Sequence, residues 1–322
     1  MKILVFGAGV LGSLYAARLH RAGHEVALYA RGSRLTALTA NGVQLEHALT
    51  GMKETVRVPV IGEVDAETTY DLVLVLVRAD QLAVAAHSLA DHRASRSVLF
   101  MVNNPAGIEA LRRTVGAERL LLGLAGADGY REGDTVKYIV LSRMLQPTTI
   151  GAPLGGGTAR LRETCTALRS AGFPVAVNRH MDAWYKFHAA WVTPVAYAIY
   201  AARASGSDLA GRPDLVRESV DATRELWRAL EDLGYRLTPT RLRLIRILPR
   251  WILVPAITGF MRTELADAAA VRHTEAAPQE MGLLAKQISA VTQAAGVPTP
   301  TWSRLFRAGE STRLSLVMEA SS

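Results

Sequence analysis

The first half of the chain alternates short apolar runs with helical patterns of apolar residues. Two strand-like runs, Lys2–Phe6 and Glu25–Tyr29, flank a helical pattern over Val10–Ala22 that ends at Gly23. Strand, helix and strand in this order are typical of a βαβ unit, whose two strands lie parallel in one sheet. The chain therefore begins with the pattern of a parallel α/β sheet.

Two later apolar runs, Leu72–Val77 and Val98–Val102, have the length and the continuous hydrophobicity of central strands buried on both faces. A polar residue follows each of them, Arg78 after the first and Asn103 after the second. Open parallel sheets bind ligands beyond the carboxyl ends of their strands. We therefore expect these two side chains to lie at one ligand-binding crevice.

Three more strand-like runs, Lys137–Leu141, Thr148–Gly151 and Pro174–Val177, complete the first half. Between the last two, the glycine run 155–157 predicts a turn that leads into a helix containing Cys165. The fold class predicted for residues 1–178 is α/β, with a doubly wound, Rossmann-type sheet.

From about residue 178 onward the apolar spacing becomes helical. The patterns cover Met181–Ala202, Pro213–Leu233 and, with interruptions, Arg262–Ala295. A chain of 322 residues has room for two cores. We therefore expect residues 179–322 to form a second, mainly α-helical domain that binds substrate and contributes to dimerisation.

Composition narrows the function classes. The net charge of +8 comes from basic residues scattered along the chain rather than from a block, which argues against nucleic acid as a partner. Cys165 is the only cysteine and lies on an apolar stripe, which indicates a core position and excludes a disulfide within the chain. The chain begins directly with strand residues, so we expect no signal peptide and a cytoplasmic location.

The segment Leu242–Phe260 is rich in Leu, Ile and Val. Three arginines interrupt it, and Pro249 and Pro255 break the pattern of a spanning helix, so we expect no stable membrane span. An interfacial helix, a wall of the substrate site and a subunit contact remain alternatives for this segment.

A G-x-G-x-x-G pattern follows the first strand and opens the first helix, which is the context that gives this common spacing its meaning. Its glycines permit a tight turn, close approach of the backbone to a pyrophosphate and close packing of helix on strand. The helix N-terminus adds N–H donors and a favourable dipole. We expect the cofactor's phosphates to lie on Gly7, Ala8, Gly9, Val10, Leu11 and Gly12.

The choice of dinucleotide depends on the residue after the second strand. NAD-specific sites usually carry an acid about 20 residues beyond the loop, to bind the ribose hydroxyls. Between Val26 and Leu45 this chain has no acid, and Arg31 stands just past the second strand. A guanidinium can hold a 2′-phosphate in a bidentate manner. The sequence therefore predicts NADP(H), with no metal ion.

Hydride transfer to a carbonyl also needs a proton donor, and Lys, His and Tyr are the usual candidates. The segment 184–191 offers one of each, with Lys186 flanked by aromatic and apolar residues in a chain of few lysines. On a helix His188 points about 160° away from Lys186, so the two cannot easily serve one site. Lys186 is the better candidate, and His188 is more typical of a packed or surface residue.

In this ordered set of residues the chain resembles the ketopantoate reductase (2-dehydropantoate 2-reductase) family, over nearly its whole length. The pieces that carry the resemblance are the start Met1-Lys2-Ile3 with the three loop glycines, Arg31, Asn103, Trp184-Tyr185-Lys186, and Asp267 with Arg272-His273-Thr274-Glu275. The resemblance implies a two-domain enzyme of pantothenate biosynthesis type that reduces a 2-keto acid with NADPH, and it leaves a homodimer open.

The resemblance also implies roles for particular residues. Lys186 would be the proton donor, and Glu275 would bind the substrate hydroxyl as its catalytic companion. Asn103 would hold cofactor and substrate, and Arg78 stands where the family has a cofactor-binding lysine. Thr263 stands where the family has a substrate-binding serine.

The chain departs from the family at two asparagines after the lysine, which are replaced by Ala190 and, before a proline, by Thr193. We assign Thr193 to the substrate site, and the loss of two amides leaves the substrate open between 2-dehydropantoate and a related carbonyl. Two alternatives stay open beside the reductase. One is a dehydrogenase of another class, β-hydroxyacid or opine; the other is a non-catalytic NADP(H)-sensing protein.

Overall fold

The computed structural model describes residues 1–65, 67–90, 92, 95–153 and 158–319. The predicted turn at glycines 155–157 lies outside these residues. The chain divides into two compact units, and each is described by itself below. The first comprises Met1–Val102 and Ile108–Met181, and the second comprises Asn103–Gly107 and the chain from Asp182 onward.

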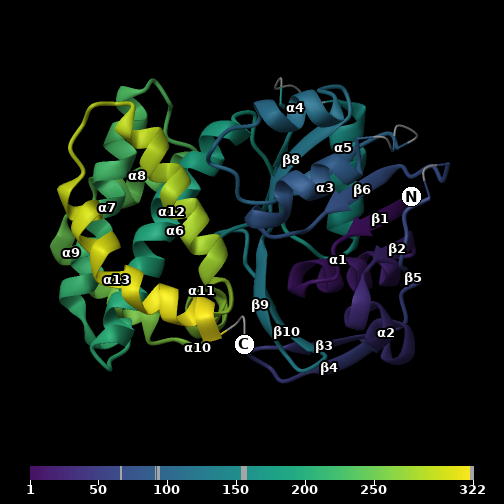
Figure 1. Cartoon of the computed structure of the whole chain (residues 1–322), viewed down its shortest axis with the longest axis horizontal. Coiled ribbons are helices and arrows are strands. Elements are labelled where there is room, and N and C mark those ends of the chain that lie inside the picture. The colour runs from purple at the N-terminus through teal and green to yellow at the C-terminus, as the bar shows by residue number, and fades with distance from the viewer. Residues whose placement is uncertain (66, 91, 93–94, 154–157, 320–322) are drawn as a thin grey trace. The chain divides into compact units, whose positions relative to one another are not determined.

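The first unit is built on an eight-stranded, mostly parallel sheet (Figure 1). In spatial order its strands are β12 (Val175–Val177), β11 (Thr148–Gly151), β8 (Leu120–Leu124), β7 (Val98–Met101), β6 (Leu72–Val75), β1 (Lys2–Phe6), β2 (Glu25–Tyr29) and β5 (Val60–Ile61). The strand order reverses at β1, because β2 lies on one side of it and β6 on the other. This is the topological switch point at which open α/β sheets bind ligands.

The central strands are buried as their continuous apolar sequences predict. All four residues of β6 and all four of β7 are buried. The helices of this unit are α1 (Val10–Arg21), α2 (Gly32–Asn41), the 3-10 turn η1 (Ala79–Gln81), α3 (Leu82–Ser88), α4 (Glu109–Val115) and α5 (Ala159–Ser170). The predicted α/β class with its Rossmann-type sheet is confirmed.

A second, four-stranded sheet belongs to the same unit and was not predicted as a sheet. Its order is β4 (Lys53–Val56), β3 (Val43–His47), β10 (Thr135–Val140) and β9 (Ala127–Glu132). Helix α1 packs against it, and Arg18 of α1 donates to the Tyr138 hydroxyl at 3.3 Å. Of these four strands the sequence analysis predicted only β10, as the run Lys137–Leu141. The parallel pairing of β3 with β10 joins segments some 90 residues apart, and local patterning carries no sign of it.

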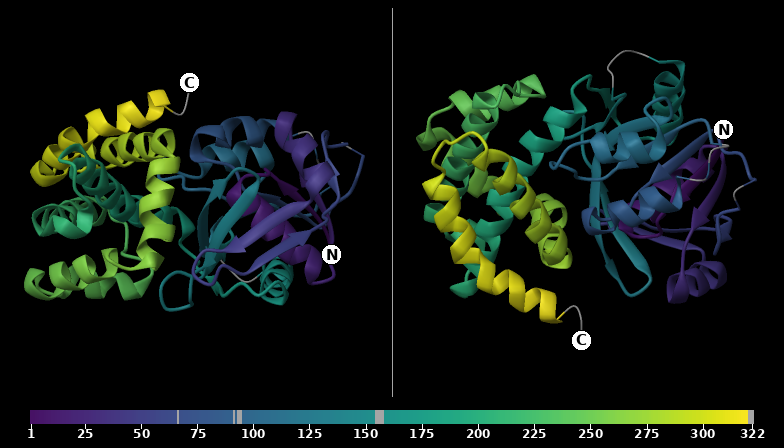
Figure 2. Two further views of the ribbon diagram at one scale, coloured as in Figure 1. Left: turned by 90° about the horizontal axis from the view of Figure 1, so that it is seen from below. Right: turned by 45° about the horizontal axis from the view of Figure 1, so that its top comes forward.

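The second unit is helical in the described residues apart from its connections (Figures 1 and 2). Its elements are α6 (Met181–Ala204), η2 (Leu209–Gly211), α7 (Pro213–Asp232), η3 (Thr240–Leu242), α8 (Arg243–Ile247), α9 (Arg250–Met261), α10 (Glu264–Ala266), the π-helical turn η4 (Asp267–Val271), α11 (Arg272–Ala276), α12 (Pro278–Gln293) and α13 (Pro300–Glu319). Helix α7 packs against α9, α12 and α13. The predicted mainly α-helical second half is confirmed.

Most of helix α6 is buried, and aromatic side chains cover much of it. Trp184 and Phe187 are almost fully buried, and the indole of Trp227 on α7 donates to the Phe187 carbonyl at 3.1 Å. Farther along, Tyr197 stacks on Phe306 of α13. These contacts fix the rotation of α6 and with it the position of Lys186.

The apolar segment Leu242–Phe260 forms two helices instead of one. Pro249 caps the N-terminus of α9 and separates it from α8, whereas Pro255 lies inside α9. Within the described ranges, no helix combines the length and the hydrophobicity needed to cross a bilayer.

Candidate active site

The glycine loop between β1 and α1 is shaped by backbone sterics. Gly7 has φ +116°, and a Cβ there would lie 2.4 Å from the Leu76 carbonyl oxygen beyond β6. A Cβ on Gly12 would lie 1.7 Å from the Gly7 carbonyl oxygen. A Cβ on Gly9, in contrast, would meet no atom of the protein within 4 Å. Two glycines are therefore required by packing, and the third leaves open space over the loop.

The N-terminus of α1 complements that open space. Gly9 is its N-cap, no side chain caps the helix, and its first turn carries no acid. The first N–H groups of a helix have no partner within the helix and carry the positive end of its dipole. Ala8, Val10 and Leu11 are partly exposed at this end. The loop and helix start could hold the diphosphate of a nicotinamide dinucleotide.

Arg31 and Arg34 lie at the beginning of α2, next to this loop in the fold. Arg31 is the exposed N-cap of α2, and the described residues give its side chain no ion-pair partner. Arg34 is largely buried, and its Nε donates to the Ala8 carbonyl at 3.2 Å while an Nη donates to Ser13 Oγ at 3.2 Å. Arg34 therefore ties α2 to the glycine loop.

The surroundings of Arg34 are electropositive. Burial, followed by the charge of Arg131 on β9, lowers the pKa of the Arg34 guanidinium, and Asp134 at 3.4 Å opposes this shift. Arg34 is not among the cofactor-binding residues predicted from the sequence. Its bond to Ala8 depends on how α2 packs, and no local signal indicates it.

Arg78 follows β6, as predicted, and lies near the switch point of the sheet. Its Nε is 3.3 Å from Asp80 Oδ1 on η1, and its side chain is about half exposed. Asp80 therefore balances part of its charge.

The loop Asn103–Gly107 follows β7 but groups with the helical unit. The side-chain oxygen of Asn103 is buried, and the described part of the chain offers it no hydrogen-bond partner. The Asn104 amide donates to the Gly107 carbonyl at 2.7 Å, and a Cβ on Gly107 would lie 3.9 Å from Asp182 Oδ1. The second asparagine closes the loop, and the loop lies beside the start of α6.

Lys186 is buried, with 3% of its surface exposed, on the second turn of α6. Its Nζ donates to Asp182 Oδ1 at 2.6 Å and lies 4.8 Å from the centroid of the Tyr235 ring. A buried charge needs such partners, because the free-energy cost of burying an isolated ammonium is far greater than that of burying an ion pair. The aromatic face adds a cation–π attraction.

Asp182, the ion-pair partner of Lys186, was not among the candidate site residues predicted from the sequence. An acid four residues before a lysine on a helix is a recognised pairing signal, so the sequence contained the information. Tyr235 lies beyond the end of α7, and only the tertiary structure brings it to Lys186.

Glu275, the second predicted catalytic residue, lies on α11 and forms an ion pair with Arg203 near the C-terminus of α6. The Tyr200 hydroxyl donates to the Thr274 carbonyl at 2.8 Å, so α11 packs against that end of α6. Arg203 is 17 residues beyond Lys186, about 25 Å along a helix. Lys186 and Glu275 are therefore held by opposite ends of α6.

The two predicted substrate-binding threonines bond to backbone. Thr263 caps α10, where its hydroxyl accepts from Ala266 N–H at 3.2 Å and donates to the Phe260 carbonyl at 2.7 Å. Thr193 is fully buried, and its hydroxyl donates to the Ala189 carbonyl at 2.8 Å. Ala190, at the other departure from the family, is also fully buried.

His188 is buried on α6 and lies edge-on to the Trp184 ring, with 5.1 Å between centroids. This contact fits the packing interpretation of His188.

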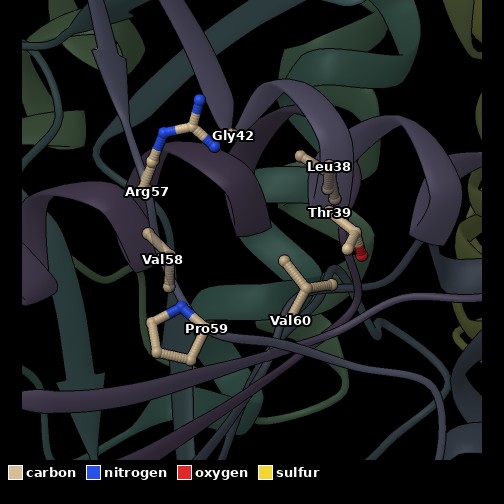
Figure 3. Close-up of a pocket in the computed structure, with 7 residues that line it drawn as sticks. All are labelled: Leu38, Thr39, Gly42, Arg57, Val58, Pro59 and Val60. Carbon is tan, nitrogen blue, oxygen red and sulfur yellow. The ribbon is translucent and has the colours of Figure 1, made fainter.

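A surface hollow of about 220 Å³ in the first unit contains none of the predicted site residues. Figure 3 shows its lining: Leu38, Thr39, Gly42, Arg57, Val58, Pro59 and Val60. It lies at the C-terminal part of α2, at the opposite end of that helix from Arg31. The glycine loop and Lys186 remain the better candidates for chemistry.

One protein-family model matches part of this chain. The sequence profile of ketopantoate reductase PanE/ApbA matches residues 3–153. A 2-dehydropantoate 2-reductase of Vibrio cholerae serotype O1 is 33% identical over 117 residues, which are 36% of this chain and 36% of that enzyme. The aligned part thus spans about a third of the length of this curated relative.

Solved structures extend the likeness to nearly the whole chain. The ternary structure of D-mandelate dehydrogenase with NADH and anilino(oxo)acetate has a TM-score of 0.73 at 17% identity, covering 98% of this chain and 99% of that one. A 2-dehydropantoate 2-reductase from Geobacter metallireducens GS-15 has a TM-score of 0.73 at 20% identity, covering 97% and 99%. At these identities the likeness shows a shared fold.

Proposed function

We propose that this chain, a divergent member of the ketopantoate reductase family, is an NADPH-dependent reductase that converts a 2-keto acid into the 2-hydroxy acid. The observation that carries the proposal is the buried Lys186–Asp182 pair beside a loop whose Asn103 oxygen is buried and unsatisfied by the described residues. A buried polar group without a partner costs about 1–3 kcal/mol. Such a group suits a ligand that supplies the missing bond.

The preference for NADPH follows from charge. No acid lies between Val26 and Leu45, and Arg31 is exposed with a free guanidinium at the end of β2 in the described structure. Arg34 on the same helix, and Arg131 near Arg34, add positive charge, of which Asp134 balances part. The solved structure of D-mandelate dehydrogenase contains NADH, so NADH is the competing cofactor. This positive charge would attract the 2′-phosphate of NADPH, whereas the unphosphorylated ribose of NADH would gain little from it.

Bound NADPH supplies the hydride that adds to the carbonyl carbon of the substrate. Lys186 gives a proton from Nζ to the carbonyl oxygen, and the two transfers together form the alcohol. Asp182 holds Nζ in place and balances the charge of the buried ammonium before the proton is transferred. Arg78 and Asn103 would position the keto acid, because both follow strands at the ligand-binding edge.

Glu275, Thr263 and Thr193 belong to the proposed substrate site by resemblance. Each already has a partner, Arg203 for Glu275 and backbone groups for the threonines. Binding of a hydroxy acid through Glu275 would require a shift of that carboxylate away from Arg203.

The substrate would be 2-dehydropantoate, the keto acid of pantothenate biosynthesis, or a related and less polar 2-keto acid. Ala190 and Thr193 offer no amide to a polar substrate, and a site without matched donors selects weakly for one. A similar protein binds anilino(oxo)acetate, so aryl-substituted oxoacids belong in the test.

A panel of 2-keto acids, 2-dehydropantoate and phenyl-oxoacetate included, tests the function by the loss of NADPH absorbance. We expect oxidation with at least one 2-keto acid and formation of the 2-hydroxy acid. Oxidation only with β-keto acids or with keto acid plus amine would instead identify a β-hydroxyacid or opine dehydrogenase.

One observation favours the alternative of a non-catalytic NADP(H)-sensing protein. The Glu275 carboxylate, which a reductase would use to bind substrate, is already paired with Arg203. Thermal stabilisation by NADPH without oxidation across the whole panel would favour an NADP(H)-sensing protein and contradict the reductase.

A further inference from the structure

The end of α7 brings an aromatic ring to Lys186. Backbone hydrogen bonds close the helix at Leu233, Gly234 and Tyr235, and the last of them joins Tyr235 N–H to the Leu230 carbonyl at 3.0 Å. Gly234 has φ +87°, a conformation that favours glycine and turns the chain out of the helix. The position of Tyr235 is therefore set by the way in which α7 ends.

Helix α7 is itself fixed on α6, the helix that carries Lys186. The Trp227 indole is almost fully buried and donates to the carbonyl of Phe187, the residue next to Lys186, at 3.1 Å. Farther along the chain, the centroid of the Tyr235 ring lies 4.8 Å from Lys186 Nζ. All four residues belong to the helical unit, so this contact is a property of that unit alone.

The Lys186 ammonium thus has two contacts of different kinds. Nζ donates a hydrogen bond to Asp182 Oδ1 at 2.6 Å, and the ring of the partly buried Tyr235 lies beside the same atom. An aromatic face carries negative charge density, so it attracts a cation. Lysine ends in a flexible stem, and a single hydrogen bond still lets its ammonium swing about the accepting oxygen. A second contact restricts that movement.

We propose that Tyr235 is a positioning residue, whose ring keeps the Lys186 ammonium at the point from which it protonates the substrate carbonyl oxygen. The inference rests on the proposed reductase function, in which Lys186 is the proton donor. A proton donor has to lie within about 2.6–3.2 Å of the acceptor atom. Displacement of a reacting group by about 1 Å can lower the rate by about 10²-fold. Loss of the ring should therefore slow the chemical step and leave cofactor and substrate binding unchanged.

A second pair of the same kind provides a matched control. In the first unit, Lys2 Nζ lies 5.6 Å from the centroid of the Tyr70 ring. Tyr70 comes before β6, at the opposite end of that strand from Arg78 and the predicted ligand-binding edge. Removing the Tyr70 ring makes the same chemical change as removing the Tyr235 ring, but at an ammonium that has no proposed part in the reaction.

Steady-state kinetics of the full chain tests the proposal, with NADPH and a 2-keto acid that the panel identifies as a substrate. Tyr235→Leu removes the ring, and we expect kcat to fall about 10–100-fold. The KM values for NADPH and for the keto acid should stay close to those of the wild type, because an interaction that serves only the chemical step affects kcat. Tyr235→Phe keeps the ring and should restore kcat. Tyr70→Leu should turn over at the wild-type rate.

A fluorinated ring separates charge from packing. Incorporation of 3,4,5-trifluorophenylalanine at position 235 keeps the shape of the ring and withdraws the negative charge from its face. We expect kcat below that of Tyr235→Phe. Because this side chain fills the same space, it also tests the proposal in the case that Tyr235→Leu does not fold.

NMR of the lysine side chains gives a readout that does not depend on activity. The chain has five lysines, so protein labelled with [¹³Cε]lysine gives five ε-methylene signals, and Lys186→Ala identifies the signal of Lys186. Protons over an aromatic face resonate upfield. We expect the Lys186 signal to move downfield in Tyr235→Leu and to keep its position in Tyr235→Phe.

Three results would overturn the proposal. One is wild-type kcat in Tyr235→Leu while Lys186→Ala loses turnover, which would leave the proposed function intact and give Tyr235 no part in it. Another is an equal loss in Tyr235→Phe and Tyr235→Leu, which would assign the effect to the hydroxyl. The third is a higher KM for the keto acid at unchanged kcat, which would make Tyr235 a substrate contact. Turnover that survives in Lys186→Ala would refute the proposed function, and this inference with it.

Discussion

Lys186 Nζ donates to Asp182 Oδ1 at 2.6 Å, and the two residues are one turn apart on α6. The lysine is buried, whereas 31% of the aspartate side chain is exposed. A partly exposed carboxylate therefore balances a buried ammonium. This pair fixes the position of the ammonium that we propose as the proton donor, and substitutions of its two members should have different effects.

Lys186→Ala should lower kcat by about 10²–10⁴, because a general acid contributes that much to proton transfer. NADPH affinity should stay the same, since the glycine loop belongs to the first unit. Steady-state kinetics with the keto acid, together with a fluorescence titration of NADPH, measures both quantities. Lys53→Ala is the control, because Lys53 is exposed on β4. Unchanged turnover in Lys186→Ala would refute the assignment.

Asp182→Asn keeps the shape of the side chain and removes its charge. We expect kcat to fall at least about tenfold, because without the carboxylate the Lys186 ammonium is no longer held at the position from which it would protonate the carbonyl oxygen. Asp182→Glu should recover part of the loss, and KM for NADPH should not change in either variant. A purely structural role would instead lower the melting temperature with little change in kcat for the folded fraction.

Arg31 and Arg34 should have separable effects. Arg31→Ala should weaken NADPH binding by about 10–100-fold and NADH binding little, as the loss of a charged hydrogen bond costs about 1.5–3 kcal/mol. Arg34→Ala should weaken both cofactors, because Arg34 bonds to the Ala8 carbonyl that shapes the loop for either one. Equal losses for NADPH and NADH in Arg31→Ala would contradict the NADP assignment. Isothermal titration with 2′,5′-ADP and 5′-AMP isolates the contribution of the 2′-phosphate.

Substitution of Gly9 and of Gly12 by alanine should separate cofactor binding from folding stability. Gly9→Ala should leave the melting temperature within a few degrees, because its Cβ meets nothing in the protein, yet it should abolish tight dinucleotide binding by filling the loop. Gly12→Ala should destabilise the fold itself, by about 3 kcal/mol or more, because its Cβ would overlap the Gly7 carbonyl. Thermal unfolding without ligand separates the two cases, and a cofactor titration of Gly9→Ala completes the test. Tight NADPH binding by Gly9→Ala would show that the dinucleotide lies elsewhere.

Glu310 on α13 links stability to pH. Burial raises the pKa of this carboxyl, but hydrogen bonds from Arg313 and Tyr197 outweigh burial and hold its pKa below the ordinary 4.5. A carboxyl whose pKa is depressed in the folded state contributes stability above its unfolded pKa and loses it as the pH falls through the folded value. The free energy of unfolding should therefore drop below about pH 4.5.

Denaturant titrations of the wild type and Glu310→Gln at neutral and acidic pH measure this contribution. Glu310→Gln should be less stable than the wild type at neutral pH and should show a weaker decline in acid. An identical acid dependence in the two proteins would assign the decline to other carboxyls.

Much of the first unit was predictable from local sequence. A continuous apolar run such as Leu72–Val75 has few alternatives to a central strand, and the spacing of the loop glycines fixes where a strand turns into a helix. The Arg31 position follows from the same local rule, because a residue just past the second strand of a βαβ unit lies at the ligand-binding edge. Asp182 could have been added from its spacing to Lys186.

Other relationships had no local signal. The bond between Arg34 and the Ala8 carbonyl, the pairing of β3 with β10, and the position of Tyr235 beside Lys186 each join segments far apart in the chain. The ion pair of Arg203 with Glu275 is of the same kind, and it holds Glu275 at the opposite end of α6 from Lys186.

The sequence by itself therefore determined the α/β and helical halves and the place of the glycine loop between β1 and α1, because steric rules and hydrophobic periodicity act over a few neighbouring residues. The tertiary structure alone decided which loop lies beside Lys186, which carboxylate balances it and which aromatic ring lies beside its ammonium. Those outcomes depend on how whole helices and strands pack, and packing is a property of surfaces assembled from distant parts of the chain.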